Sequence, residues 1–193
     1  MRRRTKTPQV GLAYFLLASS LPAQKEVFVP ANDVSFTLSA ERPTYRSGEQ
    51  IALKYKITNI SNTSLYVPQE WEVMCPAGPH VWAWFEDGSG QHFIPGYAGS
   101  CSESTNPKTV SERMNKEAVL LKPGEHLDGI LRLDTKLFGG LKPGVYRIEV
   151  VLWSWRDEKF TDAERSELAR MGHPFLRGEV PNSTSVTLTS DAK

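Results

Sequence analysis

The segment Ile51-Ala-Leu-Lys-Tyr-Lys-Ile-Thr-Asn59 decides the fold class, because apolar and polar residues alternate along it. In an extended chain, successive side chains point to opposite faces. Lysine and threonine fill most positions between the large apolar residues, so the alternation predicts a half-buried β-strand with one face on a core and the other in water. The apolar positions are Ile51, Leu53, Tyr55 and Ile57.

Similar short segments recur along the chain, and turn sequences separate them, including Lys-Pro-Gly at 122–124 and again at 142–144. Proline presets one torsion of a turn, and glycine accepts the positive φ that the next position can require. Many short strands separated in this way predict an all-β, immunoglobulin-like antiparallel β-sandwich of about seven to nine strands rather than parallel βαβ units. The strands are expected at 34–39, 51–59, 64–67, 81–86, 91–94, 118–121, 127–134, 145–153 and 185–189.

One late segment has the features of a helix. Thr161-Asp-Ala-Glu164 is a capping-box signature, and Gly172 and Pro174 supply a stop. These residues predict one short helix at 162–171, inserted between two late strands. Residues 96–116 are rich in serine, asparagine, glycine and threonine, which is typical of a long loop that is either functional or mobile.

The N-terminus has the anatomy of a secretory signal peptide. Arg2, Arg3, Arg4 and Lys6 precede an apolar run of 12 residues at 10–21, and small residues follow it. Such a run is shorter than the roughly 20 residues that a membrane-spanning helix needs. We therefore expect a signal peptide at 1–23, a single domain at 24–193, a secreted or periplasmic location, and no membrane contact after cleavage. An uncleaved signal anchor is the alternative.

The charge of the remaining chain excludes one class of partner. Residues 1–23 carry four of the 23 basic residues and none of the 22 acidic ones, which leaves 19 basic and 22 acidic residues and a net charge of −3. A mildly acidic chain lacks the electrostatic footprint of a nucleic-acid-binding protein. The sequence also contains no G-x-S-x-G, H-E-x-x-H or phosphate-binding glycine loop. We therefore expect no nucleic-acid partner, no cofactor and no enzymatic activity.

Several motifs resemble those of known families. Residues 41–61 (ERPTYRSGEQIALKYKITNIS) resemble the opening hairpin of bacterial extracytoplasmic immunoglobulin-like domains, and are similar to the P-x-Y-x-x-G-E opening of macroglobulin-type domains. Residues 81–84 (VWAW), 121–126 (LKPGEH) and 141–152 (LKPGVYRIEVVL) resemble the intracellular proteinase inhibitor family of bacilli. Together the resemblance covers about residues 33–153 and implies an immunoglobulin-like sandwich. It also implies a tyrosine corner, in which the hydroxyl of Tyr146 forms a hydrogen bond back across the preceding turn.

Only two cysteines are present, Cys75 and Cys101. In an oxidising compartment they are expected to form one disulfide, which ties the segment before residue 81 to the long loop. The alternative is a soft-metal site that combines Cys75 with His80 and either Met74 or His92. Because the histidines are scattered singly along the chain, no metal site is expected.

Tryptophans alternate with core positions in two of the expected strands. Trp82 and Trp84 take the positions between Val81, Ala83 and Phe85, and Trp153 follows an inward-pointing Leu152, with Trp155 two residues further on. If the strands are neighbours, these tryptophans form an aromatic platform that suits stacking on sugar rings or anchoring a protein. The alternative is that the 162–171 helix and the 96–116 loop cover them. The candidate binding residues are Trp82, Trp84, Trp153 and Trp155.

We therefore expect an exported, non-catalytic binding domain whose partner is an unknown protein or a cell-envelope glycan. A carbohydrate-binding module requires exposed tryptophans. A proteinase inhibitor requires a protruding, rigid loop, at 75–80 or 96–116. A structural envelope protein without a ligand requires that the tryptophans be covered.

Overall fold

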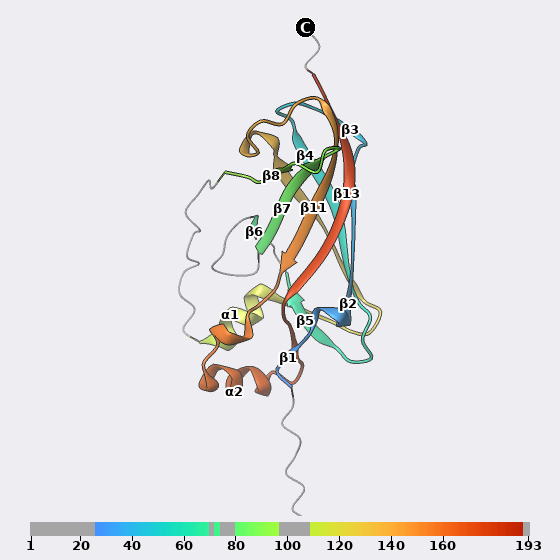
Figure 1. Cartoon of the computed structure of the whole chain (residues 1–193). Coiled ribbons are helices and arrows are strands. Elements are labelled where there is room, and N and C mark those ends of the chain that lie inside the picture. The colour runs from blue at the N-terminus through green and yellow to red at the C-terminus, as the bar shows by residue number, and fades with distance from the viewer. Residues whose placement is uncertain (1–25, 70–71, 74–79, 97–108, 191–193) are drawn as a thin grey trace, which may run out of the picture.

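Two β-sheets packed face to face form the body of the protein, and two helices lie at one end of it (Figure 1). The computed structural model describes residues 26–69, 72–73, 80–96 and 109–190. Within these residues, no helix has the length and apolar character that a membrane span requires.

The first sheet has three antiparallel strands in the order β10-β4-β2. The second has the order β3-β13-β11-β7-β6, with β8 also paired to β7. The strands of the first sheet are β2 (Val34–Ala40), β4 (Gln50–Asn59) and β10 (His126–Asp134). Those of the second are β3 (Thr44–Arg46), β6 (Glu72–Val73), β7 (His80–Asp87), β8 (His92–Phe93), β11 (Gly144–Trp153) and β13 (Glu179–Thr189).

This arrangement is immunoglobulin-like. In chain order, β2, β4 and β10 take the places of strands A, B and E, while β7, β11 and β13 take those of C, F and G. The short β3 follows β2 but pairs in parallel with β13, so the chain crosses from one sheet to the other at this edge. The expected all-β sandwich is confirmed.

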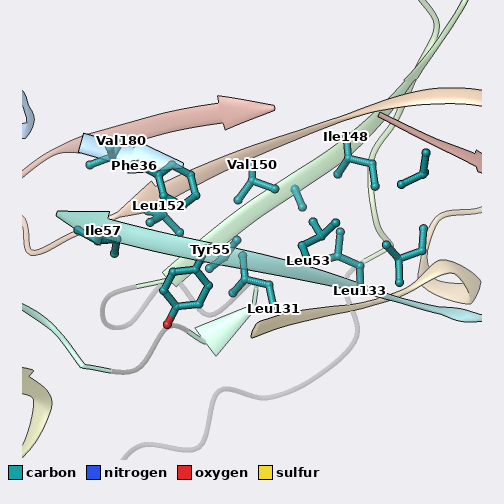
Figure 2. Close-up of a cluster of buried hydrophobic side chains, with 14 of the residues drawn as sticks. Phe36, Leu53, Tyr55, Ile57, Leu131, Leu133, Ile148, Val150, Leu152 and Val180 are labelled. Atoms are coloured by element: carbon teal, nitrogen blue, oxygen red, sulfur yellow. The ribbon is translucent and has the colours of Figure 1, made fainter. Parts of the chain in front are cut away.

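The core fills the space between the two sheets, and Figure 2 shows its centre. The alternation along β4 predicted its contribution, because Ile51, Leu53 and Ile57 are fully buried and face side chains from the other sheet. The opposing residues come from three neighbouring strands: Val81, Ala83 and Phe85 of β7, Ile148, Val150 and Leu152 of β11, and Val186 and Leu188 of β13.

Polar side chains hold the edges and turns of the sandwich. Asn59 is completely buried, and its Nδ2 donates to the carbonyl oxygens of Thr63 (2.8 Å) and Leu121 (2.9 Å). Its amide side chain therefore ties the turn after β4 to the end of β9. Between the sheets, Nδ2 of Asn182 in β13 donates to the carbonyl oxygen of Phe36 in β2, which joins the two sheets.

Two tyrosines explain two of the sequence motifs. Tyr146 forms the expected tyrosine corner: its hydroxyl donates to the carbonyl oxygen of Lys142 (2.9 Å) and accepts from the Lys142 amide (3.0 Å). Tyr45, in the P-x-Y-x-x-G-E motif, is 2% exposed, and its hydroxyl donates to the carbonyl oxygen of Ala52 (3.0 Å). Gly48 in the same motif has a φ of 81°, which glycine adopts without strain.

A small third sheet and the helices form a second core. The sheet has the order β1-β12-β5-β9, and its strands are β1 (Phe28–Val29), β5 (Leu65–Pro68), β9 (Ala118–Leu121) and β12 (Phe175–Leu176). The helices are α1 (Val110–Glu117) and α2 (Asp162–Arg170). The buried residues of this core are Phe28, Val110, Met114, Trp155, Phe160, Leu168 and Phe175.

The two helices differ in how well the sequence predicts them. Helix α2 begins with the expected capping box, in which Thr161 and Glu164 exchange hydrogen bonds. Helix α1 lies inside the segment that was expected to be a loop, and Thr109 caps it by accepting from the Glu112 amide (3.2 Å). With only Val110 and Met114 buried, α1 has too little apolar periodicity to be recognised in the sequence.

The strand expectations need smaller corrections. Strands β1, β3, β6 and β12 were missed because two or three residues cannot display a period of two. Strand β13 begins at Glu179 rather than at residue 185, because Pro181 and the polar residues after it hide its first half. Three short 3-10 helices complete the described elements: Ala31–Asp33, Thr135–Leu137 and Asp157–Lys159.

The Gly129→Ala substitution is expected to destabilise the fold. Gly129 of β10 lies directly opposite Tyr55 of β4, and a Cβ at this position would overlap the Tyr55 ring. Overpacking of this kind costs about 1–3 kcal/mol in the free energy of unfolding, measurable by urea denaturation. The control is Gly88→Ala, because an added Cβ there has no atom within 4 Å. Equal midpoints for the two variants would contradict this packing.

The contact between the helices is expected to weaken at acidic pH. The Ser111 hydroxyl and the Ser111 amide (3.0 Å) of α1 both donate to Glu167 of α2, and these bonds lower the pKa of the Glu167 carboxyl. A lowered pKa means that this stabilisation is present at neutral pH and is lost as the pH falls below 4.5 towards the folded-state value. Thermal melts from pH 7 to 3 should therefore show a smaller acid-induced loss of stability in Glu167→Gln than in the wild type. The control is Glu158→Gln, at an exposed position, which should follow the wild type; an identical loss in all three proteins would contradict the role of Glu167.

Candidate binding face

Strand alternation directs two tryptophans of β7 away from the core. Val81, Ala83 and Phe85 are at most 1% exposed and face the first sheet. Trp82 and Trp84 take the alternate positions and so lie on the outer face of the second sheet. Trp82 is 37% exposed, while Trp84 is half-buried.

The neighbouring strand β11 adds a third tryptophan to the same face. Its alternate residues face the core, which directs Val151 and Trp153 outward. Val151 lies opposite Trp82, and Trp153 is the next outward residue along β11, so Trp82 and Trp153 are diagonal neighbours. Such neighbours are within reach of aromatic side chains. Trp82, Trp84 and Trp153 are called the tryptophan face below.

Burial continues on the outer side of the second sheet, between the strands that carry the tryptophan face. Val151 points outward, yet it is only 8% exposed. Its direct neighbours across the two adjoining strands are Trp82 and Pro181. Large side chains on both sides of Val151 account for its burial. The tryptophan face is therefore an apolar surface in which Trp82 is exposed and Trp84 and Trp153 are half-buried.

Charged residues surround the tryptophan face in pairs. On β11, a guanidinium nitrogen of Arg147 lies 2.7 Å from a carboxylate oxygen of Glu149, which is directly opposite Trp84. On the far side of β7, the His92 ring lies 3.8 Å from the Glu86 carboxylate. Arg147 and Glu149 were not among the candidate residues, although their positions between core residues of β11 place them on the outer face.

Arg156 contacts the tryptophan face in a different way. Its guanidinium carbon lies 4.6 Å from the centroid of the Trp153 ring, which is a cation–π contact. The Arg156 side chain is exposed, and it follows the end of β11. Nothing in the sequence marks this arginine, because the contact depends on how the chain turns after the strand.

Trp155 does not belong to the tryptophan face, which corrects the expectation of four clustered tryptophans. It is 5% exposed and packs edge-to-face on Phe175 in the second core, with ring centroids 5.5 Å apart. Strand β11 ends at Trp153, so the alternation no longer applies two residues later. Both helices contribute to this second core, and residues 97–108 of the loop considered as a cover lie outside the described residues.

The expected disulfide lies outside the described residues, as do Cys75, Cys101 and Met74. His80 begins β7, and His92 pairs with Glu86 at the edge of the tryptophan face. Across the described part of the chain, no three His, Cys, Asp or Glu side chains gather in a way that could hold a metal ion.

The carboxyl groups with shifted pKa values hold turns and helix ends. Hydrogen bonds from the Ser89 side chain, the Gln91 amide and the Ser89 amide lower the pKa of Asp87 in the turn after β7. The side chain of Arg42 and the Arg46 amide lower the pKa of Glu49 in the turn before β4. Each carboxylate satisfies backbone donors locally, which is a structural role.

The outer face of the first sheet provides the contrast. Lys54 and Lys56 of β4 point outward, with serines and threonines of β2 opposite them. The Lys56 ammonium lies 3.9 Å from the Asp128 carboxylate of β10, and both side chains are exposed. This surface is a solvated face, whereas the equivalent surface of the second sheet carries three tryptophans.

Comparison with known proteins does not assign the chain to a family. No protein-family model and no curated protein sequence matches the chain. Among solved structures, a β-glucosidase from Erythrobacter marinus is similar at a TM-score of 0.39 and 13% identity, covering 81% of this chain and 15% of the enzyme. The alkylpurine DNA glycosylase AlkC of Pseudomonas fluorescens is similar at 0.37 and 11% identity, with 81% and 30% covered. A PapD-like domain of human CEP192 is similar at 0.35 and 12% identity, with 96% and 99% covered. Similarities at this level carry no information about activity.

Acrylamide quenching is expected to rank the tryptophans by their positions. Trp82 is 37% exposed and Trp155 is 5% exposed. The Trp82→Phe variant should therefore quench less than the wild type, and Trp155→Phe should quench more per remaining tryptophan. Stern–Volmer slopes of the native proteins, with urea-unfolded samples as controls, provide the measurement. The opposite order would contradict the placement of Trp155 in the second core.

Proposed function

We propose that the protein is an exported, non-catalytic binding domain and that the tryptophan face contacts its ligand. The observation that carries this proposal is the contrast between the two outer faces of one sandwich. One presents mainly lysine, serine and threonine, together with the exposed Ile130, and the other presents Trp82, Trp84 and Trp153. Both have the same geometry, so the fold itself does not require tryptophans at these positions.

The energetics of tryptophan support a binding role. A tryptophan that remains partly accessible on a sheet surface contributes less to folding than one in the core, because less of its apolar area leaves water. The same side chain is among the strongest contributors to binding, since it offers a large rigid surface with a single hydrogen-bond donor. Three such residues on adjoining strands form a continuous contact area.

Export is supported by the sequence of the N-terminal segment. Four basic residues precede the apolar run at 10–21, which is the pattern of a secretory signal. An exported domain meets cell-envelope glycans and secreted proteins, and both classes bind to surfaces that present tryptophan. The described residues around the tryptophan face also supply charged and hydroxyl groups, including Arg147, Glu149 and Ser183, which suit hydrogen bonding to either class.

Paired variants on the two outer faces test the proposal. Residues 24–193 are compared as wild type, Trp82→Ala with Trp84→Ala, and the control Lys54→Ala with Lys56→Ala. The probes are soluble β-glucan, xyloglucan, galactomannan and polygalacturonate in affinity electrophoresis, and purified peptidoglycan in a sedimentation assay. We expect the wild type and the lysine control to bind at least one probe, and the tryptophan variant to lose that binding.

Circular dichroism and thermal melts establish that each variant is folded before its binding is compared. Loss of probe binding in a folded tryptophan variant supports the proposal. Equal binding by all three proteins would place the site elsewhere, and no binding to any probe, with quenching unchanged by every probe, would overturn the carbohydrate class.

A further inference from the structure

We propose that the ligand of the tryptophan face is an acidic polysaccharide, whose carboxylate binds Arg156 while a neighbouring sugar ring stacks on the tryptophans. This inference rests on the proposed binding function and names the class of ligand. The structure that carries it is the juxtaposition of a cation and an aromatic ring at the end of β11, with 4.6 Å between the Arg156 guanidinium carbon and the Trp153 ring centroid.

Arg156 differs from the other basic side chains of this face in its partners. Arg147 pairs with Glu149, and His92 pairs with Glu86. Among the described side chains, no carboxylate forms an ion pair with Arg156, although Glu179 lies across from Trp153 on β13. Among the described side chains of this face, Arg156 therefore carries a positive charge that a ligand can neutralise without first breaking an ion pair of the protein.

The cation–π contact leaves Arg156 able to bind a carboxylate. Its guanidinium interacts with the Trp153 ring through its positive charge, and the N–H donors of its planar fork can still bind an acceptor. Those N–H groups match the two oxygens of a carboxylate in a bidentate arrangement. The cation–π contact with Trp153 also limits the orientations of the long side chain, so less conformational entropy is lost when the ligand binds.

A uronic acid polymer fits this combination of groups. Each pyranose ring presents an apolar C–H surface that can stack on a tryptophan, and its carboxylate projects from the edge of the ring. Trp82 and Trp153 are diagonal neighbours, and Arg156 borders the second of them, so stacking and charge recognition lie side by side. A nucleic acid would also offer rings and negative charge, but its phosphates need many cations. The face offers one unpaired arginine among the described side chains.

The test uses two polymers with the same sugar backbone, polygalacturonate and its fully methyl-esterified form, in which a neutral methyl ester replaces each carboxylate. Residues 24–193 are compared as wild type, Arg156→Gln, Trp153→Phe and the control Arg132→Gln, whose arginine is exposed on the outer face of β10. Dissociation constants come from isothermal titration calorimetry at low and at moderate salt. The wild type should bind the acid about tenfold more tightly than the ester, a difference of about 1.4 kcal/mol, because only the acid can form a charged hydrogen bond with Arg156.

Arg156→Gln should bind both polymers as weakly as the wild type binds the ester, and its affinity should no longer depend on salt. Arg132→Gln should match the wild type. Trp153→Phe should weaken binding to both polymers, because it removes stacking area as well as the support for Arg156.

The outcomes separate this inference from the proposed function. Equal affinity for acid and ester, or an Arg156→Gln variant that behaves like the wild type, overturns the acidic ligand but leaves a neutral glycan on the tryptophan face. Absence of binding to both polymers overturns the inference. The wider probe panel then tests separately whether the tryptophan face binds another glycan. Polyglutamate bound more tightly than polygalacturonate, with dependence on Arg156, would replace the polysaccharide with an acidic peptide.

Discussion

The opposite directions of neighbouring side chains along β7 and β11 are the constraint on which the rest of this structure depends. Burial of Val81, Ala83 and Phe85 in the core leaves Trp82 and Trp84 no position other than the outer face. A register slip by one residue would exchange the two sets and place tryptophans between the sheets. The core and the tryptophan face are therefore two consequences of the same register, fixed by the pairing of β7 with β11.

The second core extends the sandwich at the end where the tryptophan face finishes. Strand β11 ends at Trp153, and the chain then turns so that Trp155 enters the contact with Phe175. Arg156 is the next residue, and its guanidinium contacts the Trp153 ring. The buried Trp155 thus holds the segment that carries the exposed Arg156. The segment from Trp153 to Arg156 therefore links the packing of the second core to the geometry of the tryptophan face.

The sequence predicts the strands of the sandwich well where alternation is long, as in β4 and β11, because each residue there reports which face it occupies. Where the alternation ends, the sequence no longer predicts on which side of the sheet a side chain lies. The two-residue spacing predicted that Trp155 lies on the same face as Trp153, but the alternation of side chains does not apply beyond the end of the strand. Arg156 carries no local signal at all, since its contact with Trp153 depends on a turn in three dimensions. Helix α1 was missed because two buried residues make a weak pattern.

The buried amide of Asn59 has a consequence for how this protein is made. Asn59 and Asn182 each begin an N-x-[ST] triplet, the acceptor sequence for N-linked glycans. A glycan would have to be attached to Nδ2, which in Asn59 donates to Thr63 and Leu121 inside the protein and in Asn182 joins the two sheets. Asn62 begins a third triplet and is exposed. In a host that glycosylates secreted chains, a glycan on Asn62 is compatible with the fold. A glycan on Asn59 or Asn182 would remove the hydrogen bonds that these side chains make in the folded protein.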